Sequence, residues 1–529
     1  MVKWGSDVYH LDLDRGKDNR FFRRIDMSKL FSGIFALLFA FASWLPLPNL
    51  FFTRVSACYA SAVTRCAEQP DPADLQIYPV PKGTPQSGKS FFQVTADQYP
   101  VGVYTDLTPW EGNAHFAYVN MREGREVTFR VNANFRFRKV KVLPESLGIE
   151  PQVCRGQVSF TVSQPNQNIT LVFDDHYNGH TLHLFTNPID DDAPTESGEN
   201  LVYFGPGYHF LKEQLDIGAN QTLYIAPGAV VDGRIRLEAA HNAAVRGSGV
   251  LMNSVYRDGG EIILQVGASG HVTIEGIVFS SQQVRKWNLA THNVNGMAIR
   301  NVKIVSPRYA STDGMDINNS RNVTVAGCFI RTGDDCIAIK GFDASLPAEN
   351  IVVENCVLWN EVNNAMALGA ETKALYYRNI IFRNIDVLFS YDDRDHHGEL
   401  DERSVMSIVS LHSTYFEDIT WEDIRVNRCE RLICLTFVDS FWFGSIPGDQ
   451  TAPGGMRNVA FRNISSDSPD GKAARNEILL SGNAANGGNP EKMIENVVFD
   501  NVEVNGAVVT ESYRKLQIRG PVTALAFRA

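Results

Sequence analysis

The chain has 529 residues, enough for two or three domains, and an apolar content of 44% that is ample for a hydrophobic core. Its formal net charge of −11 argues against a nucleic-acid partner and gives no general attraction to acidic polymers. The sequence has no Cys-x-x-Cys pair and no His-Glu-x-x-His motif, so we predict neither a metal nor a cofactor.

Residues 1–62 are predicted to be an N-terminal extension that contains a targeting segment. Basic residues at positions 20–29 precede an apolar run from Leu30 to Leu45, which is short for a membrane span and suits a signal peptide. We therefore predict a secreted or extracytoplasmic protein whose mature form has no stable membrane span. Val55-Ser56-Ala57-Cys58 resembles a lipoprotein cleavage site, so a lipoprotein or signal-anchored form is the alternative.

Residues 75–190 have the pattern of a small β-sandwich. Short alternating stretches, such as 91–94, 127–131 and 158–162, recur with turn residues between them. A polar linker follows, up to Asn200. We expect this domain to act as a structural brace, with substrate binding as the alternative.

From residue 201 to residue 510 one motif recurs: an Asn, an alternating strand, a second Asn or Gly in the sixth place, and an apolar seventh residue. The spacing is typical of a stacked solenoid, and strand propensity without a helical period predicts a right-handed parallel β-helix. Residues 511–529 are predicted to be a C-terminal tail. The seventh residues should form an aliphatic ladder inside the coil: Ile277, Cys328, Cys356, Ile385, Ile424, Ile464 and Val502.

Four acids lie within this repeat: Asp313, Asp316, Asp334 and Asp335. Consecutive coils lie about 4.8 Å apart, so Asp313 should meet the Asp334–Asp335 pair on one outer face. Clustered carboxylates push their pKa values apart, which lets one act as an acid while another acts as a base. Inverting glycosidases hold such groups about 6.5–9.5 Å apart, and we expect neighbouring coils to give that separation. A solvated turn or a calcium loop is the alternative.

Two blocks carry a resemblance to a known family. Thr312-Asp313-Gly314-Met315-Asp316 and Gly333-Asp334-Asp335-Cys336 resemble the Asn-Thr-Asp-Gly-Ile-Asp and Gly-Asp-Asp-Cys blocks of polygalacturonases, glycoside hydrolase family 28. The resemblance implies a pectin-lyase-like coil and hydrolysis with inversion. It assigns Asp334 as the general acid, and Asp313 and Asp335 as the residues that activate water. Asp316 would line the site or bind substrate.

Two later blocks of that family are missing. Its Gly-His-Gly block should fall at Asn363-Asn364-Ala365, and its Arg-Ile-Lys block, which grips the galacturonate carboxylate, should fall near residues 404–413. We place Asn363 and Asn364 among the substrate-binding residues, together with Lys340 and Glu371. The missing clamp favours a neutral sugar. The order of sandwich and coil is similar to that of the dextranases and isopullulanases of family 49, which cut neutral α-glucans.

These features together predict a secreted inverting glycosidase that cleaves a polysaccharide or oligosaccharide in a polygalacturonase-like way. A dextranase-like hydrolase of a neutral α-glucan is one alternative, and an inactive carbohydrate-binding β-helix is another. Trp287, Tyr309 and Trp359 are candidates to stack on sugar rings, with core or rim packing as the alternative. The charged stretch 391–403 would wall the cleft or stay solvated, and Cys429 with Cys434 is a candidate short-range disulfide.

Overall fold

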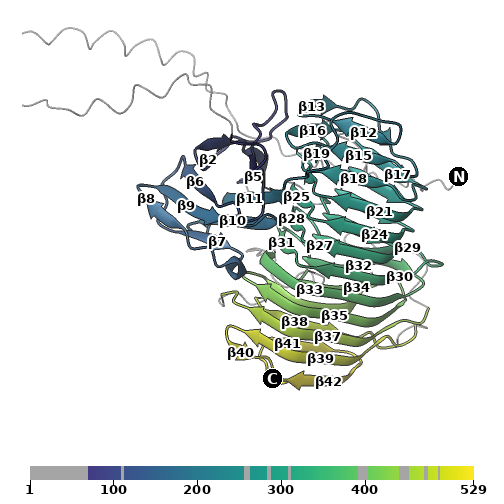
Figure 1. The fold of residues 1–529 in the computed structure, drawn as a ribbon. Coiled ribbons are helices and arrows are strands. Elements are labelled where there is room, and N and C mark those ends of the chain that lie inside the picture. The colour runs from purple at the N-terminus through teal and green to yellow at the C-terminus, as the bar shows by residue number, and fades with distance from the viewer. Residues whose placement is uncertain are drawn as a thin grey trace, which may run out of the picture. The chain divides into compact units, whose positions relative to one another are not determined.

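The computed structural model describes residues 70–108, 112–254, 262–282, 287–307, 311–390, 403–439, 452–469, 475–485 and 489–529. Gln69–Ala529 form one compact unit built mainly of β-strands (Figure 1). The targeting segment predicted within residues 1–62 lies outside the described residues. Across the described ranges, no helix has the length and apolarity that crossing a bilayer requires.

The front of this unit is a sandwich of two sheets that share one core, as predicted. Val94 and Phe129 of one sheet pack with Leu171 and Leu182 of the other. The first sheet contains β1 (Leu75–Gln76), β4 (Tyr104–Leu107), β5 (Asn113–Met121), β7 (Val140–Leu143), β10 (Gln167–Phe173) and β11 (His180–Pro188). The second contains β2 (Phe92–Ala96), β3 (Tyr99–Val101), β6 (Val127–Ala133), β8 (Gln152–Cys154) and β9 (Gln157–Val162), and one 3₁₀ turn, η2 (Glu145–Leu147), follows β7.

After the linker the chain forms the predicted parallel β-helix. Equivalent strands of successive coils pair in parallel, as Val323 does with Ile351, whereas the short strand β40 (Ala507–Val508) pairs antiparallel with β39 (Met493–Val504). The larger sheet contains twenty strands: β12 (Leu201–Phe204), β13 (Gly207–Phe210), β15 (Thr222–Ile225), β16 (Ala229–Asp232), β18 (Ala244–Gly247), β19 (Val250–Met252), β21 (Gly270–Glu275), β22 (Val278–Ser280), β24 (Asn295–Arg300), β25 (Lys303–Ser306), β27 (Arg321–Ala326), β28 (Phe329–Thr332), β30 (Ala348–Glu354), β31 (Val357–Asn360), β33 (Tyr377–Ser390), β35 (Tyr415–Val426), β37 (Gly455–Ser466), β39 (Met493–Val504), β40 (Ala507–Val508) and β42 (Val522–Arg528).

Within the described residues the second sheet of the coil has eleven strands, and Asp313 and the Asp334–Asp335 pair lie just before two of them. Its strands are β14 (Leu215–Asp216), β17 (Ile235–Glu238), β20 (Leu264–Gly267), β23 (Leu289–His292), β26 (Met315–Asn318), β29 (Ile337–Asp343), β32 (Met366–Ala374), β34 (Met406–Ser410), β36 (Arg431–Phe437), β38 (Glu477–Ser481) and β41 (Leu516–Arg519).

Ladders of side chains hold neighbouring coils in register. Asn322 donates its Nδ2 hydrogen to Oδ1 of Asn295 at 2.7 Å, Asn350 donates to Asn322 at 3.1 Å, and Asn379 donates to Asn350 at 2.8 Å. Asn322, Asn350 and Asn379 have φ values of 56°, 54° and 53°, a left-handed conformation that Asn tolerates better than most residues. Inside the coil, all seven residues of the predicted aliphatic ladder are buried.

The coil continues beyond residue 510, where the sequence predicted a tail. β41 pairs with β38, and β42 pairs with β39. The physical reason is that the alternation of the repeat persists: Leu525 pairs with Val497, and the Phe527 ring stacks on Phe499 at 4.9 Å between ring centroids.

The short-range disulfide considered for Cys429 and Cys434 is not formed, and both side chains are buried. Cys434 lies within β36, where the extended backbone rises about 3.3 Å per residue. A disulfide requires Cα atoms within about 7 Å, which an extended five-residue separation exceeds.

We expected no Walker-type loop from the sequence, but Gly83–Ser90 has the Gly-x-x-x-x-Gly-Lys-Ser spacing of one, so that expectation was wrong as to the motif. A phosphate-binding loop needs a helix directly after it. Here the next element is β2, and the backbone N–H of Ser87 donates instead to the Gln282 side chain at 2.8 Å. The stretch therefore lacks the context of a nucleotide site.

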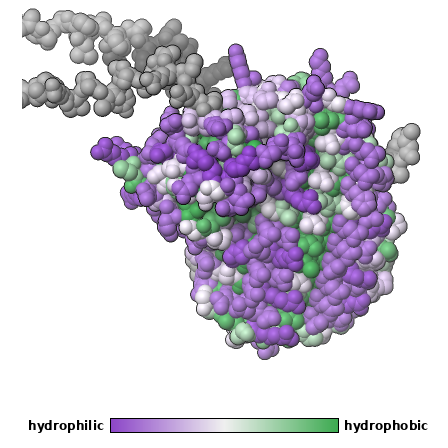
Figure 2. Space-filling model, in the orientation of Figure 1, coloured by the Kyte–Doolittle hydropathy of each residue, from purple (hydrophilic) through white to green (hydrophobic). Residues whose placement is uncertain are grey.

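The sandwich packs against the coil through a second apolar core. Phe116 and Phe185 of the sandwich meet Phe329 and Trp359 of the coil. Trp359 is fully buried, so it is a core residue and not a platform for a sugar ring. Hydrophilic residues cover most of the outer surface in the view of Figure 2, so the apolar side chains of both parts are largely turned inward.

A buried ionic network crosses this interface beside the apolar core. Arg331, on β28, pairs with Glu361 at 2.6 Å, and neither side chain is exposed. The Arg331 guanidinium also donates to Thr181 Oγ1 at 2.6 Å and contacts His183 Nε2 at 2.9 Å, both on β11 of the sandwich. Burial and the charge of Arg331 hold the pKa of His183 well below its ordinary value, so this imidazole is neutral. The sandwich therefore supplies polar partners for a charge that belongs to the coil.

Candidate active site

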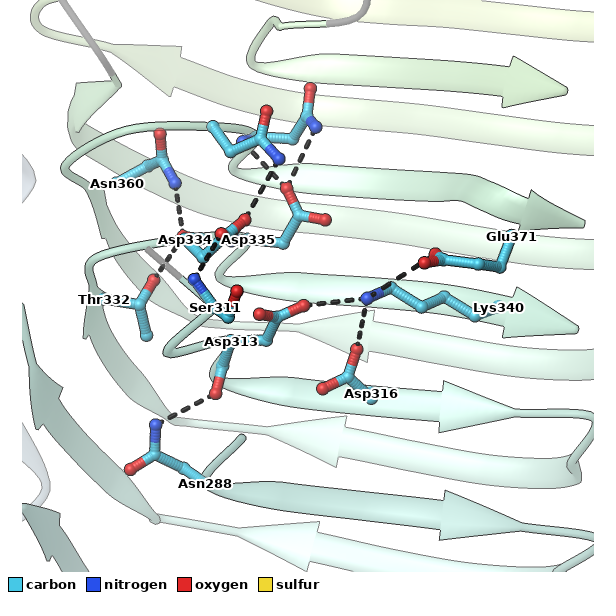
Figure 3. A network of polar contacts seen from close by, with 12 residues as sticks. Asn288, Ser311, Asp313, Asp316, Thr332, Asp334, Asp335, Lys340, Asn360 and Glu371 are labelled. Carbon is cyan, nitrogen blue, oxygen red and sulfur yellow. Dashed lines mark hydrogen bonds and ion pairs between the residues drawn. The ribbon is translucent and has the colours of Figure 1, made fainter. Parts of the chain in front are cut away.

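The acids lie where two consecutive coils turn into the second sheet. The backbone N–H of Gly314 donates to the Asp335 carbonyl at 2.8 Å, and that of Met315 donates to the Cys336 carbonyl at 3.0 Å. Asp313, immediately before this pairing, therefore lies beside the Asp334–Asp335 pair of the next coil (Figure 3). Gly314 is required here because a Cβ at this position would stand 2.4 Å from the Cys336 carbonyl oxygen.

Asp313, Asp334 and Asp335 form one cluster, in which each contributes an oxygen within 4.8 Å of the others. The gathering of these acids on one face follows the expected stacking of coils. This distance concerns the nearest oxygens, so the expected separation of about 6.5–9.5 Å between whole carboxyl groups stays a prediction. Asp313 and Asp335 are almost fully buried, whereas Asp334 is partly exposed.

Asp334 is held by hydrogen bonds to both its side chain and its backbone. The backbone N–H of Ser311 donates to Oδ2 at 2.6 Å, and Asn363 donates to Oδ1 at 3.0 Å. The Asp334 carbonyl accepts from Asn360 at 2.6 Å and from the Thr332 hydroxyl at 2.8 Å. The turn that presents this carboxylate is therefore fixed on several sides before any ligand arrives.

Asp335 is oriented by Asn364. Its Oδ1 accepts hydrogen bonds from the backbone N–H and from the side-chain Nδ2 of Asn364, each at 2.9 Å. The amide of Asn364 is itself fixed, because its Oδ1 accepts from the backbone N–H of Ser404 at 2.9 Å. In this structure Asn363 and Asn364, which the sequence suggested as substrate contacts, thus touch the acids directly. Their alignment with the missing Gly-His-Gly block was the signal that brought them to the site.

Lys340 is a buried cation surrounded by carboxylates. Its Nζ lies 2.7 Å from Asp313, 2.8 Å from Asp316 and 3.8 Å from Glu371. The same ammonium lies over the Trp287 ring, 4.4 Å from its centroid. The sequence had placed Lys340, Asp316 and Glu371 among the substrate contacts, and the structure joins all three in one ionic group behind Asp313.

Burial and mutual repulsion raise the proton affinity of this cluster. Burial raises the pKa of Asp313 to about 6, although the Lys340 ammonium lowers it. Burial and then the charge of Asp313 raise the pKa of Asp316 well above its ordinary value. Burial and the charges of Asp334 and Asp313 do the same to the pKa of Asp335. Burial alone would lower the pKa of Lys340, but Asp313 and Asp316 outweigh it and raise that pKa well above its ordinary value.

Burial thus favours the protonated form of Asp335, whereas Asp313 ionises above about pH 6. These are the two requirements of acid–base catalysis. Three carboxylates at this spacing also offer oxygen ligands of the kind that Ca²⁺ and Mg²⁺ bind. The Lys340 ammonium at 2.7 Å already supplies a positive charge to Asp313.

One column of the second sheet runs from Asp316 through uncharged residues. Asp316, Ala338, Ala367 and Ser407 stand in register on successive strands. Residues 404–413, where a uronate clamp was expected, contain neither Arg nor Lys. The Ser407 hydroxyl is buried and has no hydrogen-bond partner among the described residues. Tyr309 and residues 391–402 of the expected cleft wall lie outside the described residues, and of the three aromatic candidates Trp287 contacts this group.

Comparisons with known proteins support the resemblance seen in the motifs. Residues 256–360, which include all three acids, match the family described as glycosyl hydrolases family 28. The chain is 28% identical over 117 residues to an endo-polygalacturonase of Pectobacterium carotovorum subsp. carotovorum, covering 22% of this chain and 28% of that protein. It is 30% identical over 117 residues to a probable polygalacturonase of Arabidopsis thaliana, covering 17% of this chain and 26% of that protein. The chain therefore spans about a quarter of the length of these curated relatives.

Among solved structures, the chain is similar to Dex49A from Penicillium minioluteum. The TM-score is 0.60 at 14% identity, and the match covers 85% of this chain and 96% of that chain. At this identity the likeness concerns the fold. It extends through most of both chains, which agrees with the predicted similarity in layout.

Proposed function

Starting from the relationship of this chain to the polygalacturonase-like superfamily of family 28 glycoside hydrolases, we propose that it hydrolyses glycosidic bonds of a polysaccharide or oligosaccharide. The observation that carries this proposal is the cluster of three acids, with oxygens within 4.8 Å of one another. A protein that only binds sugar has no need to gather buried carboxylates, since each raises the cost of ionising the others. The acid cluster therefore favours hydrolysis over the alternative of an inactive carbohydrate-binding β-helix.

In the proposed reaction Asp334 protonates the glycosidic oxygen, while Asp313 and Asp335 hold and deprotonate the attacking water. Asp334 suits the first role because it is the partly exposed member of the cluster. Asp313 and Asp335 both have a raised proton affinity, because burial raises the pKa of each. Asp313 ionises near pH 6, which supplies the base in the same pH range. Lys340 and Asp316 act behind Asp313 by setting its charge.

The stereochemical outcome is a separate part of the proposal. We propose inversion, on the family resemblance. Retention through a covalent intermediate is the alternative. Proton NMR of the anomer formed first distinguishes the two: inversion gives the opposite anomer from the substrate linkage, and detection of the same anomer as the substrate rejects a single displacement.

The composition of residues 404–413 bears on the substrate. Without Arg or Lys at residues 404–413, the site offers a uronate no bidentate partner there. A neutral α-glucan is therefore the second candidate, alongside polygalacturonate. Action on either polymer outside the cell would require the export predicted from residues 1–62.

Release of reducing ends from polygalacturonate, dextran and pullulan tests the proposal. We expect release from at least one polymer, and its loss by a factor of at least about 1,000 in Asp334→Asn, with substrate binding retained. Asp500→Asn makes the same chemical change on β39, away from the acids, and should keep the native rate. No release from any of the three polymers, or a near-native rate in Asp334→Asn, would overturn the assigned chemistry.

A further inference from the structure

A cavity of about 710 Å³ lies away from the acids, between the coil and the segment that joins it to the sandwich. One wall is a single outward column of the coil: Tyr203, Tyr224, Arg246, Glu275, Arg300 and Ala326, which stand in register on six successive strands. The opposite wall comes from residues 187–195 and from Gln76 and Tyr78. Strands about 4.8 Å apart make this column about 24 Å long, so the cavity suits an extended ligand.

The cavity combines flat apolar rings with uncharged hydrogen-bonding groups. The Tyr203 and Tyr224 rings are stacked, with centroids 6.2 Å apart and planes 19° apart. At the base lie the buried side chains of Asn120 and Ser248, joined by a hydrogen bond of 2.9 Å from the Asn120 amide. A sugar ring presents apolar C–H faces and hydroxyl edges in the same molecule, so it suits a cavity that combines aromatic rings with uncharged hydrogen-bonding groups.

The charges in the cavity balance one another. Arg246 and Glu275 are adjacent on the column, with Nε and Oε2 3.5 Å apart. Arg300 follows them, and Asp190 on the opposite wall accepts a hydrogen bond of 2.9 Å from the Tyr224 hydroxyl. Arg246 and Arg300 thus balance Glu275 and Asp190 in the lining of the cavity, so the cavity favours neither an anionic nor a cationic ligand.

The cavity and the acids lie at opposite ends of the same short strands. Asn301 and Gly327, which line the cavity, come before β25 and β28, and Thr312 and Asp334 come after them. Each strand has four residues, or about 13 Å, and their outer face is covered by the sandwich through Phe329. A ligand in the cavity is therefore separate from a ligand at the acids.

We propose that this cavity is a second carbohydrate site, which binds a neutral oligosaccharide chain of the class that the acids cut. The claim that this sugar belongs to the same class as the substrate rests on the proposed function. The claim that the cavity binds a neutral sugar does not. The site would hold the polymer on the enzyme while another segment of the chain occupies the acids, and this raises its effective concentration there.

Calorimetric titration of the Asp334→Asn protein with isomaltotetraose and with maltotetraose tests this proposal. We expect two molecules of one of these sugars per chain in Asp334→Asn, and one molecule in Asp334→Asn combined with Tyr203→Ala. Tyr415→Ala removes the same type of side chain from an exposed position on β35, and it should leave the stoichiometry at two. Thermal melting of each variant checks that Tyr203→Ala has not unfolded the protein.

Unchanged binding in the Tyr203→Ala protein, or preferential binding of tetragalacturonate over both neutral sugars at that site, would overturn the second site. Failure of the proposed function would look different. If no polymer is cut but Tyr203-dependent binding of a neutral sugar persists, the second site stands and the glycosidase assignment fails. On an active enzyme, Tyr203→Ala should raise KM for a long polymer at least about threefold and leave kcat for a short oligosaccharide unchanged.

Discussion

Replacing Lys340 with Met should shift the pH dependence of catalysis. The Lys340 ammonium lies 2.7 Å from Asp313 and lowers the pKa of this acid, which is about 6 with the lysine present. An opposite charge at this range lowers a carboxyl pKa by about 1–3 units, so its loss should raise the pKa of Asp313 by a similar amount. At pH 6 the ionised fraction of the base would fall from about one half to between about 10% and 0.1%, which is a loss of about 5- to 500-fold in kcat/KM.

The measurement is kcat/KM between pH 4.5 and 9 for the wild type and for Lys340→Met. The sign follows from the role of Asp313 as a base: it works when ionised, so activity is lost as pH falls through its pKa, and the variant should lose activity at a higher pH. Lys373→Met is the matched control, because Lys373 is an exposed lysine on the adjacent strand β32. A Lys340→Met protein that is slower by one constant factor at all pH values, with an unmoved acidic limb, would refute the electrostatic reasoning.

Four further changes test the rest of the site. Asn364→Ala leaves the Ser404 N–H without its acceptor and removes one of the two hydrogen bonds to Asp335 Oδ1, so we expect kcat about 10- to 100-fold lower and an unfolding free energy lower by about 1–3 kcal/mol in denaturant titration. Arg331→Met leaves Glu361 buried without its cation, and should lower that free energy by about 3–5 kcal/mol; a loss below about 1 kcal/mol would contradict the network. Because the pKa of Asp316 is raised in the folded state, its stabilising contribution is present at acidic pH and lost as pH rises; Asp316→Asn should therefore melt at a higher temperature than the wild type at pH 8 but not at pH 4. Dialysis against EDTA should leave hydrolysis unchanged, whereas loss of rate restored by Ca²⁺ or Mg²⁺ would reassign the acid cluster as a cation site.

The repeat was predictable because each position has a physical requirement that only a few residues meet. The turn positions need a left-handed backbone, which selects Asn, as at Asn350, and the inner positions need apolar side chains. The coil that begins near residue 295 has Gly296 with φ of 86° at the place where its neighbour has Asn322. It satisfies the same backbone requirement with another residue, which is why counting Asn residues passes over it.

The acid cluster was predictable in membership, because the two motifs contain all three acids. The structure adds the register of the coils, in which Gly314 pairs with Asp335 and Asp313 therefore lies beside the later pair. The ionic role of Lys340 also depends on register, because Asn318 of β26 pairs with Lys340 of β29 and this brings the lysine to Asp316 and Asp313. Without the register, an exposed lysine that contacts substrate was an equally reasonable expectation.

The network across the interface could not be predicted from the sequence. Arg331 and His183 are 148 residues apart, and each occupies an ordinary alternating strand. A buried arginine in a strand has no local signature, because its partners come from a different sheet. The same holds for the cavity beside Tyr203, whose walls come from segments that only the folded chain brings together.

The ionic contact between Arg331 and the sandwich has a consequence for engineering. Chimeric enzymes are commonly assembled by exchanging the front module of one protein for that of another. Here such an exchange would leave the Arg331 guanidinium buried under the new module without its sandwich partners. Arg331 lies two residues before Gly333, which leads into Asp334. Any graft would have to retain Thr181 and His183, so the sandwich cannot be exchanged independently of the coil.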